Sequence, residues 1–356
     1  MGKRLSQKKK IAFSAALSLL TLLVLFWLVF RNHYKEILHN IYAASTGGLV
    51  WILTMGLAYP LLESMICRVL VKRKIKSFSF RQALEVTLLG VFGNVATLSV
   101  GSLPMQSAYL HRRGMAPGEA AGIMSMEYVL HKSSVLLCGG ILLLLGGQDI
   151  FQRHQNLLPY ILFGYLVCIA IIVLLILVCT WKRFYQLTCK GILQLGKVPE
   201  WTVRADRLKL QADALYVGAR DLLHAPKAIW ASVGINALKL LSLYSVPYLC
   251  AEAIGLNDLS FIQVQVLSAL THVISNALPN IAGMGSVEAA FLLLFSQYMN
   301  PADASSVLIL YRLSTYFVPF LISAFVREKI GLRLCAADGS VVFQNTSDQE
   351  EKHGIS

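Results

Sequence analysis

Six apolar segments, each 20 to 27 residues long, run through most of this chain of 356 residues. They cover residues 11–30, 41–66, 120–146, 157–180, 228–250 and 305–326. A helix of about 20 apolar residues spans the hydrocarbon core of a bilayer, where the backbone must satisfy its own hydrogen bonds. Charged residues make up only 14% of the chain and hydrophobic residues 56%. The sequence therefore predicts an all-α polytopic integral membrane protein with about six full spans.

Two further apolar regions, 84–104 and 260–299, are interrupted by residues that break helices. Pro104 lies at the end of the first region, and the second contains Pro279, Gly283 and Gly285. Proline removes a backbone donor, and glycine permits a tight reversal. Non-helical backbone is tolerated at membrane depth only where protein encloses it or where it lines a wet cavity. We expect each region to form a re-entrant helical hairpin; a kinked transmembrane helix is the alternative.

Basic residues indicate which ends of the spans share one side of the membrane. Of the 32 lysines and arginines, 26 fall in 1–10, 67–81, 105–119, 181–227 and 327–356. Positively charged loops stay in the cytoplasm, so we expect both termini there, in a multi-pass protein of the cell membrane. The first hairpin then opens to the cytoplasm and the second to the outer side, as in an inverted repeat. Eight or nine simple spans are the alternative.

The expected organisation is an integral membrane domain over 1–330 and a cytoplasmic polar tail over 331–356. Within the domain, residues 181–227 form a cytoplasmic loop whose mixed charges favour either an interfacial amphipathic helix or a solvated connector. A Leu-Pro pair occurs in each hairpin region, at 103–104 and 278–279. The two pairs stand about half the chain apart, which favours a repeat.

Charged side chains inside apolar segments are costly and indicate functional positions. We expect Ser286 to cap the returning helix of the second hairpin, which leaves Glu288 in the first turn of that helix. Arg312 in the last span is the expected partner of this carboxylate. The candidates for substrate binding are polar or charged residues at membrane depth: Gln106, Glu127, His131, Lys132, Lys239, Asn276, Glu288 and Arg312. Internal salt bridges that fix helix packing are the alternative role.

The net charge of +13 is explained by basic loops beside membrane spans, so we expect membrane lipids as partners and no nucleic acid. Association between copies of the chain stays open. Seven cysteines, without a C-x-x-C spacing and mostly in apolar runs, are typical of small buried hydrophobic residues. The sequence indicates no metal site and no cofactor.

The stretch ALPNIAGMGSVEAAFLLLF, followed by YRLSTYFVP, resembles the membrane domain of the lysylphosphatidylglycerol synthase family, bifunctional proteins that make and flip aminoacyl lipids. The shared pattern is Leu-Pro, a Gly-rich turn, Gly-x-x-Glu-Ala and a later Arg-Leu: Leu278, Pro279, Gly283, Gly285, Glu288, Ala289, Arg312 and Leu313. The first half is more loosely similar in GSLPMQSAYLHRRGMAPGEAAG, where Gln106-Ser107 replaces the Gly-Glu of some members. The resemblance covers about 10–330 and implies a lipid-translocating fold with two re-entrant hairpins. It also implies a stand-alone member, because the polar tail is too short for the soluble synthase domain.

The resemblance and the intramembrane charges favour flippase-like movement of a polar lipid, such as an aminoacyl-phospholipid or a glycolipid. Carboxylates would bind the cationic parts of the headgroup, and basic side chains would bind its phosphate. Motion of one half against the other would expose the site to each leaflet.

Two alternatives stay open. One is aminoacyl-lipid synthesis of the phosphatidylglycerol lysyltransferase type, in which Glu127 and His131, four residues apart on one helix face, would act as acid and base. The other is a non-catalytic membrane subunit.

Overall fold

The expected membrane spans coincide with long apolar helices in the computed structural model, which describes residues 34–97, 99, 101–195, 202–278, 284–330, 332–337 and 340–345. Within these residues, five helical segments are long and apolar enough to cross a membrane: Thr46–Val71, Pro117–Gly146, Gln155–Val178, Pro226–Ala253 and Pro301–Ile330. They correspond to five of the six predicted spans, and the remaining one, 11–30, lies outside the described residues. The prediction of an all-α polytopic membrane protein is confirmed.

These spans are α3 (Thr46–Val71), α6 (Pro117–Gly146), α8 (Leu158–Thr180), α11 (Pro226–Ala253) and a continuous rod of α14 (Pro301–Arg312), the π-helix η2 (Leu313–Phe317) and α15 (Val318–Ile330). Local sequence sets where they begin. α3 starts five residues later than expected, because Ser45 Oγ accepts a 3.1 Å hydrogen bond from the Gly48 amide and caps the helix there. α6, α11 and α14 each carry proline in the first turn, where its missing N–H has no intrahelical partner to lose.

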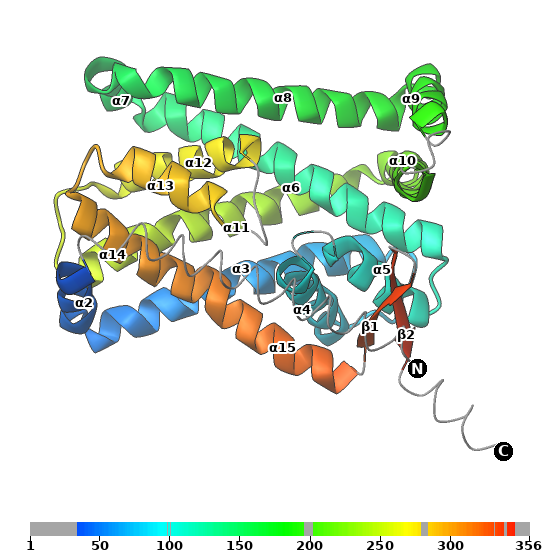
Figure 1. The fold of residues 1–356 in the computed structure, drawn as a ribbon, viewed down its shortest axis with the longest axis horizontal. Coiled ribbons are helices and arrows are strands. Elements are labelled where there is room, and N and C mark those ends of the chain that lie inside the picture. Colours follow the sequence, from blue (N-terminus) through cyan, green and yellow to red (C-terminus); the bar gives the residue numbers. More distant parts are fainter. Residues whose placement is uncertain are drawn as a thin grey trace.

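α8 lies along one side of the molecule (Figure 1). It exposes large apolar side chains along its length: Leu162, Phe163, Leu166, Ile169, Val173, Leu174 and Ile176. An apolar surface of this extent is unusual on a soluble monomer. Lipid chains solvate such side chains, so this face of α8 is suited to the hydrocarbon of a bilayer.

Both interrupted regions form pairs of helices that are too short to cross a bilayer singly. The pairs are α4 (Phe80–Ala96) with α5 (Ser102–Arg112), and α12 (Phe261–Ala277) with α13 (Ser286–Phe295). A helix of 17 residues is about 25 Å long and one of ten residues about 15 Å, whereas the hydrocarbon core is about 30 Å thick. Figure 1 shows α12 and α13 in the left half of the molecule and α4 and α5 in the right half. We interpret this arrangement as two re-entrant hairpins that start from opposite ends of the molecule.

The two hairpins begin with the same capping motif. Ser79 Oγ accepts from the Gln82 amide at 3.3 Å, and Gln82 Oε1 accepts from the Ser79 amide at 2.8 Å. Ser260 and Gln263 make the corresponding pair of hydrogen bonds at 3.3 and 3.0 Å. Each capping box opens a helix of 17 residues. The shared motif supports an internal repeat that the Leu-Pro comparison only suggested.

In the first hairpin, the interruption of the helix lies before Pro104 and not at it. Its interruption falls between Ala96 and Ser102, and Ser99 within it has a φ of 78°, which is uncommon for a residue other than glycine. Pro104 is the third residue of α5, where the absence of an N–H breaks no helical hydrogen bond. The prediction that Pro104 breaks this hairpin was wrong.

The Leu-Pro pairs therefore do not occupy equivalent positions. The first pair belongs to α5, whereas Leu278 directly follows α12, and Pro279 and Gly283 lie outside the described residues. The positions that do correspond are Gly101-Ser102 and Gly285-Ser286, each of which opens the second helix of a hairpin.

The long helices of the two halves run in opposite directions. α3 runs from left to right in Figure 1, and α11 runs from right to left while packing against it. The first hairpin, which follows α3, and the second hairpin, which follows α11, therefore start from opposite ends of the molecule. We interpret the pair of halves as an inverted-topology repeat.

The segment predicted as a cytoplasmic loop contains two helices, α9 (Lys182–Leu195) and α10 (Thr202–Leu223). α10 packs so closely on α6 that a Cβ added at Gly218 would lie 2.5 Å from the carbonyl oxygen of Gly122. α10 is thus part of the packed structure rather than a solvated connector. Short helices complete the helical part: α2 (Tyr34–Ala43), α7 (Gln148–Arg153) and the 3-10 helix η1 (Gln155–Leu157).

After α15, two strands form an antiparallel hairpin within the region predicted as a polar tail. They are β1 (Leu332–Ala337) and β2 (Ser340–Asn345), with Leu332 opposite Asn345. β2 contacts α5 at the end of the molecule where the first hairpin opens.

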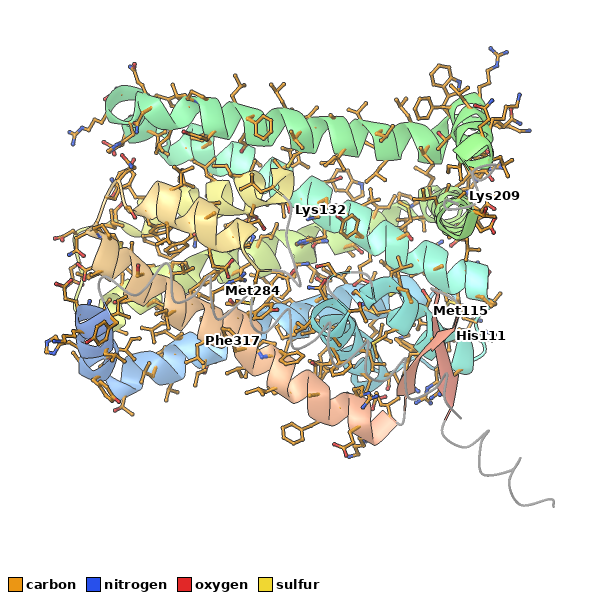
Figure 2. All side chains as sticks on the ribbon, in the orientation of Figure 1. His111, Met115, Lys132, Lys209, Met284 and Phe317 are labelled. Carbon is orange, nitrogen blue, oxygen red and sulfur yellow. The ribbon has the colours of Figure 1, made fainter. Side chains whose placement is uncertain are left out.

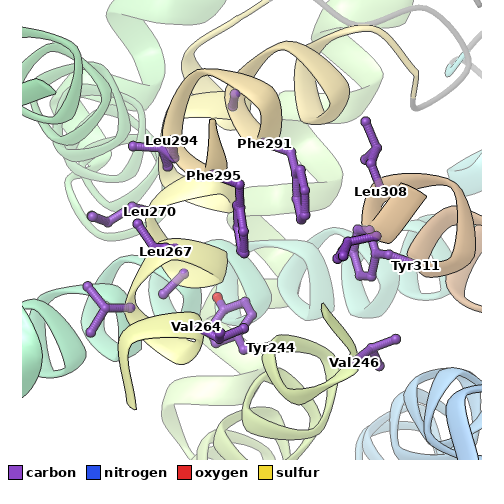
Figure 3. Packing of buried hydrophobic residues seen from close by; sticks show 14 of the residues in the cluster. Tyr244, Val246, Val264, Leu267, Leu270, Phe291, Leu294, Phe295, Leu308 and Tyr311 are labelled. Carbon is purple, nitrogen blue, oxygen red and sulfur yellow. The ribbon is translucent and has the colours of Figure 1, made fainter. Parts of the chain in front are cut away.

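Stacked aromatic rings form part of the core between α13, α14 and α11 (Figure 3). The Phe291 and Phe295 rings are 3.9 Å apart and nearly parallel, and Tyr311 stacks beyond Phe291 at 6.0 Å. Between helices in lipid, packing contacts supply stability that the hydrophobic effect does not, since lipid is as apolar as the core.

Charged side chains occur both inside the molecule and at its ends. Lys132 lies in the middle of the molecule, whereas Lys209 lies at its right-hand end (Figure 2).

Candidate functional site

A buried ion pair joins the second hairpin to the last span. Arg312 Nε lies 2.6 Å from Glu288 Oε1, with the two side chains 10% and 20% exposed. The arginine also lies over the ring of Tyr316, 5.0 Å from its centroid. A guanidinium that combines a carboxylate contact with an aromatic face is held in one orientation.

The turn before α13 positions the carboxylate. Gly285 has a φ of 95°, which favours glycine, and it is the N-cap of α13. Its amide donates a 2.7 Å hydrogen bond to Glu288 Oε2. Ser286, which we expected to be the cap, is instead the first residue of the helix. Glu288 nevertheless lies in the first turn, where the helix dipole favours a negative charge.

A second ion pair joins the long helices of the two halves. Lys239 of α11 binds Glu63 Oε2 of α3, and the Lys239 side chain is fully buried. Its ammonium also donates to His131 Nδ1 at 3.1 Å and lies 5.0 Å from the Tyr59 ring centroid. Because an ammonium has no lone pair, this nitrogen of His131 must be the acceptor and carries no proton.

Glu127 and His131 lie on α6 beside this pair. Glu127 is 6% exposed and interacts electrostatically with Glu63 and Lys239. Within the part of the chain that the structure describes, it forms no hydrogen bond and no ion pair. His131 is engaged by Lys239 rather than by Glu127, so the two residues do not form the acid–base pair considered from their spacing.

Lys132 connects the halves at a third point. Its ammonium donates to Asn276 Oδ1 in the last turn of α12 and lies 5.3 Å from the Tyr128 ring centroid. The structure thus pairs two of the predicted candidates, one from α6 and one from the second hairpin.

A central cavity of about 310 Å³ lies between the two hairpins. Its wall includes residues of α3, α4, α5, α11, α12 and α14, and so draws on both halves of the chain. The polar residues that line it include Glu63, Asn94, Ser102, Gln106, His272 and Arg312. Glu63 and Arg312 are each backed by a counter-ion behind the wall, Lys239 and Glu288 respectively. The cavity therefore presents one anionic and one cationic group, each partly neutralised.

The predicted binding residues differ in how directly they contribute to this cavity. Gln106 and Arg312 are among the described residues that line it. Glu288 and Lys239 contact lining residues, His131 contacts Lys239, and Lys132 and Asn276 form their own hydrogen bond. Glu63 was missed, although a carboxylate within the apolar segment 41–66 carries the same signal that selected Glu288.

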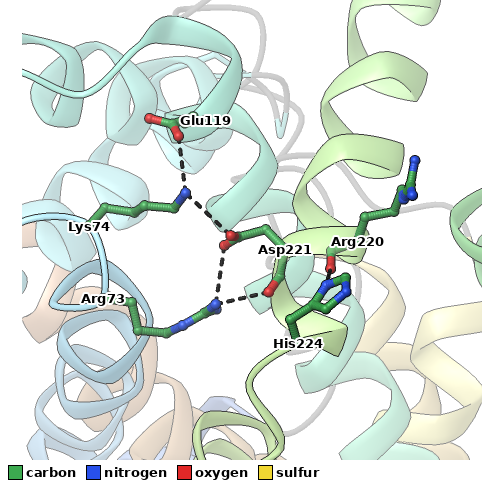
Figure 4. A network of polar contacts seen from close by, with 6 residues as sticks. All are labelled: Arg73, Lys74, Glu119, Arg220, Asp221 and His224. Atoms are coloured by element: carbon green, nitrogen blue, oxygen red, sulfur yellow. Dashed lines mark hydrogen bonds and ion pairs between the residues drawn. The ribbon is translucent and has the colours of Figure 1, made fainter.

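A separate polar network lies at the end of the molecule where α10 meets α6 (Figure 4). Lys74 Nζ lies 3.1 Å from Glu119 and 3.2 Å from Asp221, and Arg73 donates to the Asp221 carbonyl at 2.8 Å. Hydrogen bonds from Lys74 to Glu119 and Asp221 raise the pKa of this lysine. The network ties the loop after α3 to both α6 and α10.

The fold and the buried charges define a class: helical membrane proteins in which long spans and two interrupted helix pairs contribute charged and polar side chains around a central cavity. A family model described as the lysylphosphatidylglycerol synthase TM region matches residues 11–323. The chain belongs to this family. A comparison with curated proteins finds no match.

Proposed function

We propose that this protein moves a phospholipid with a charged headgroup between the two leaflets of a membrane. The observation that carries the proposal is the central cavity, whose wall holds Glu63 from the first half and Arg312 from the second. Arg312 suits a phosphate, and Glu63 suits an ammonium or other cationic group. The acyl chains would remain in the bilayer beside the exposed apolar helices.

The backing ion pairs suggest how a headgroup enters and leaves. A phosphate that binds Arg312 competes with Glu288, and an ammonium that binds Glu63 competes with Lys239. Arg312 and Glu63 each exchange one charge contact for another, while the displaced Glu288 keeps its hydrogen bond from the Gly285 amide and the displaced Lys239 keeps its contact with His131. Movement of one half of the repeat against the other would then open the cavity to each leaflet in turn.

The distribution of basic residues supports an orientation within the cell membrane. Arg73, Lys74, Arg112 and Lys329 lie at the same end as α9 and α10. We propose that this end, and with it the C-terminal segment, faces the cytoplasm, because positive loops are retained there.

The test is lipid movement in proteoliposomes that contain the purified chain and a fluorescent phosphatidylglycerol or phosphatidylethanolamine. Dithionite added outside bleaches only the outer leaflet, so movement appears as loss of the protected signal. We expect Glu288→Gln and Arg312→Ala to slow movement at least about tenfold, the loss of one charge-assisted contact. Arg153→Gln, at the opposite end and 79% exposed, serves as the control. Wild-type rates in both cavity variants would refute the proposal.

A further inference from the structure

A second pocket, of about 600 Å³, lies between the start of α4 and the ends of α5 and α15. We call it the basic pocket; its polar lining residues are Arg81, Glu85, Tyr109, Arg112, Arg113 and Lys329. It shares no described lining residue with the central cavity. It brings a hairpin of the first half together with the last helix of the second half.

Among the described residues of this lining there is one carboxylate, Glu85, and its neighbours already contact it. The Tyr109 hydroxyl donates to Glu85 Oε2 at 2.5 Å, and Arg81 and Arg113 lie 3.4 and 4.0 Å from its oxygens. Arg113 also donates to the Tyr109 hydroxyl at 3.0 Å. These contacts fix Arg113 at the wall and leave the pocket with an excess of positive charge.

Two cations in the lining have no such partner. Arg112 and Lys329 form no ion pair or hydrogen bond with any residue that the structure describes, and both are exposed. They come from different halves of the chain, one from the end of α5 and one from the end of α15. Both line the same pocket, so an anion bound there would meet a basic side chain from each half.

Apolar side chains complete the wall. Leu84, Leu88 and Val326 line the pocket beside the charged groups. α4 begins at this level and the candidate span that includes α15 ends there, so we place the pocket near one surface of the membrane. A ligand that combines a phosphate with an acyl chain matches both parts of the lining, whereas inorganic phosphate uses only one.

We propose that the basic pocket binds the phosphodiester headgroup of an anionic phospholipid from the leaflet at this end of the molecule. The guanidinium of Arg112 and the ammonium of Lys329 contact the phosphate, and an acyl chain lies against Leu84 and Leu88. A zwitterionic lipid is disfavoured, because its own cation would lie among arginines and a lysine. The site is separate from the transport cavity and does not depend on the proposed function.

The experiment is native mass spectrometry of the full chain in detergent with added dioleoyl phosphatidylglycerol or dioleoyl phosphatidylcholine. We expect more phosphatidylglycerol than phosphatidylcholine bound to the wild type. The double variant Arg112→Gln/Lys329→Gln should weaken phosphatidylglycerol binding about 25-fold, about fivefold for each basic residue near the headgroup. The matched control Lys182→Gln/Lys190→Gln removes the same charge from exposed positions on α9 and should change binding less than about twofold.

Three outcomes would overturn the proposal. The first is equal binding of the two lipids to the wild type, which needs no variant to interpret. The second is an equal loss in the pocket and α9 variants, which would indicate general attraction to a basic surface. The third is displacement of the lipid by millimolar inorganic phosphate, which would indicate a free-anion site. The transport test uses variants of Glu288 and Arg312, and this test uses variants of Arg112 and Lys329, so failure of the transport proposal is distinguishable from failure of this one.

Discussion

Arg312 and Glu288 are 24 positions apart in the sequence, yet the arginine Nε lies 2.6 Å from a carboxylate oxygen of the glutamate. The second carboxylate oxygen accepts the Gly285 amide, so Glu288 links the turn before α13 to the end of α14. The pair therefore has a structural role beside the proposed one in transport. The two roles can be separated by measuring stability and lipid movement on the same variants.

Glu288→Gln should lower the thermal midpoint of the protein in detergent by several degrees. The amide keeps one acceptor for Gly285 but replaces the charged partner of the Arg312 guanidinium by a neutral one, and removing one partner of a buried ion pair costs about 3–5 kcal/mol at most. Scanning fluorimetry measures the shift. Glu252→Gln, an exposed carboxylate on α11, is the control and should shift the midpoint by less than about one degree. Equal shifts would mean that the ion pair contributes nothing to stability.

Lys239→Met should cost about 3–5 kcal/mol of unfolding free energy, because it leaves Glu63 without its buried partner. Adding Glu63→Gln should recover more than half of that loss, since the second change removes the unpaired charge. Urea unfolding of both single variants and the double variant forms a double-mutant cycle. Strictly additive effects would contradict a direct interaction between the two side chains.

Gly218→Ala should destabilise the protein by about 1–3 kcal/mol. The added Cβ would lie 2.5 Å from the backbone oxygen of Gly122, and a backbone atom cannot move aside as a flexible side chain does. Gly234→Ala is the matched control, because no heavy atom lies within 4 Å of a Cβ at this position inside α11. Alanine favours a helix over glycine there, so Gly234→Ala should be neutral or stabilising by up to about 1 kcal/mol.

Alkaline pH should remove the stabilising effect of Lys74. The hydrogen bonds that Lys74 donates to Glu119 and Asp221 raise its pKa above the ordinary value of 10.5. The folded protein therefore holds this proton more tightly than the unfolded chain, and the stabilisation is complete below pH 10.5 and is lost as pH rises through the higher folded pKa. The difference in thermal midpoint between wild type and Lys74→Met should shrink across that range. A difference that does not shrink as the pH rises above 10.5 would contradict the assignment, and Lys76→Met, an exposed neighbour, serves as the control.

The long spans could be predicted because length and apolarity alone decide them. The span that became α3 shows the limit: its start at Thr46 depends on one serine cap, which the apolar pattern does not reveal. The partnership of Glu288 with Arg312 could also be suggested, since both are charged residues in neighbouring apolar segments.

The contact between Glu63 and Lys239 could not be predicted in the same way. The two residues are 176 positions apart and meet because α3 packs against α11. The position of Pro104 shows the converse error. A proline in the sequence marks a helix end in general, but whether it lies before or within the first turn depends on the backbone around it.

The π-helix after Arg312 has a consequence for sequence change in this span. A π turn holds about one residue more than an α turn, so removing one residue between Leu313 and Phe317 would convert η2 to regular helix and keep both flanks facing their present neighbours. The same deletion within α14 or α15 would turn one flank by about 100° relative to the other. A one-residue deletion in η2 therefore leaves both Arg312 and the exposed face of α15 in their present orientations. We expect single-residue length changes in this span to be tolerated at η2 and not in α14 or α15.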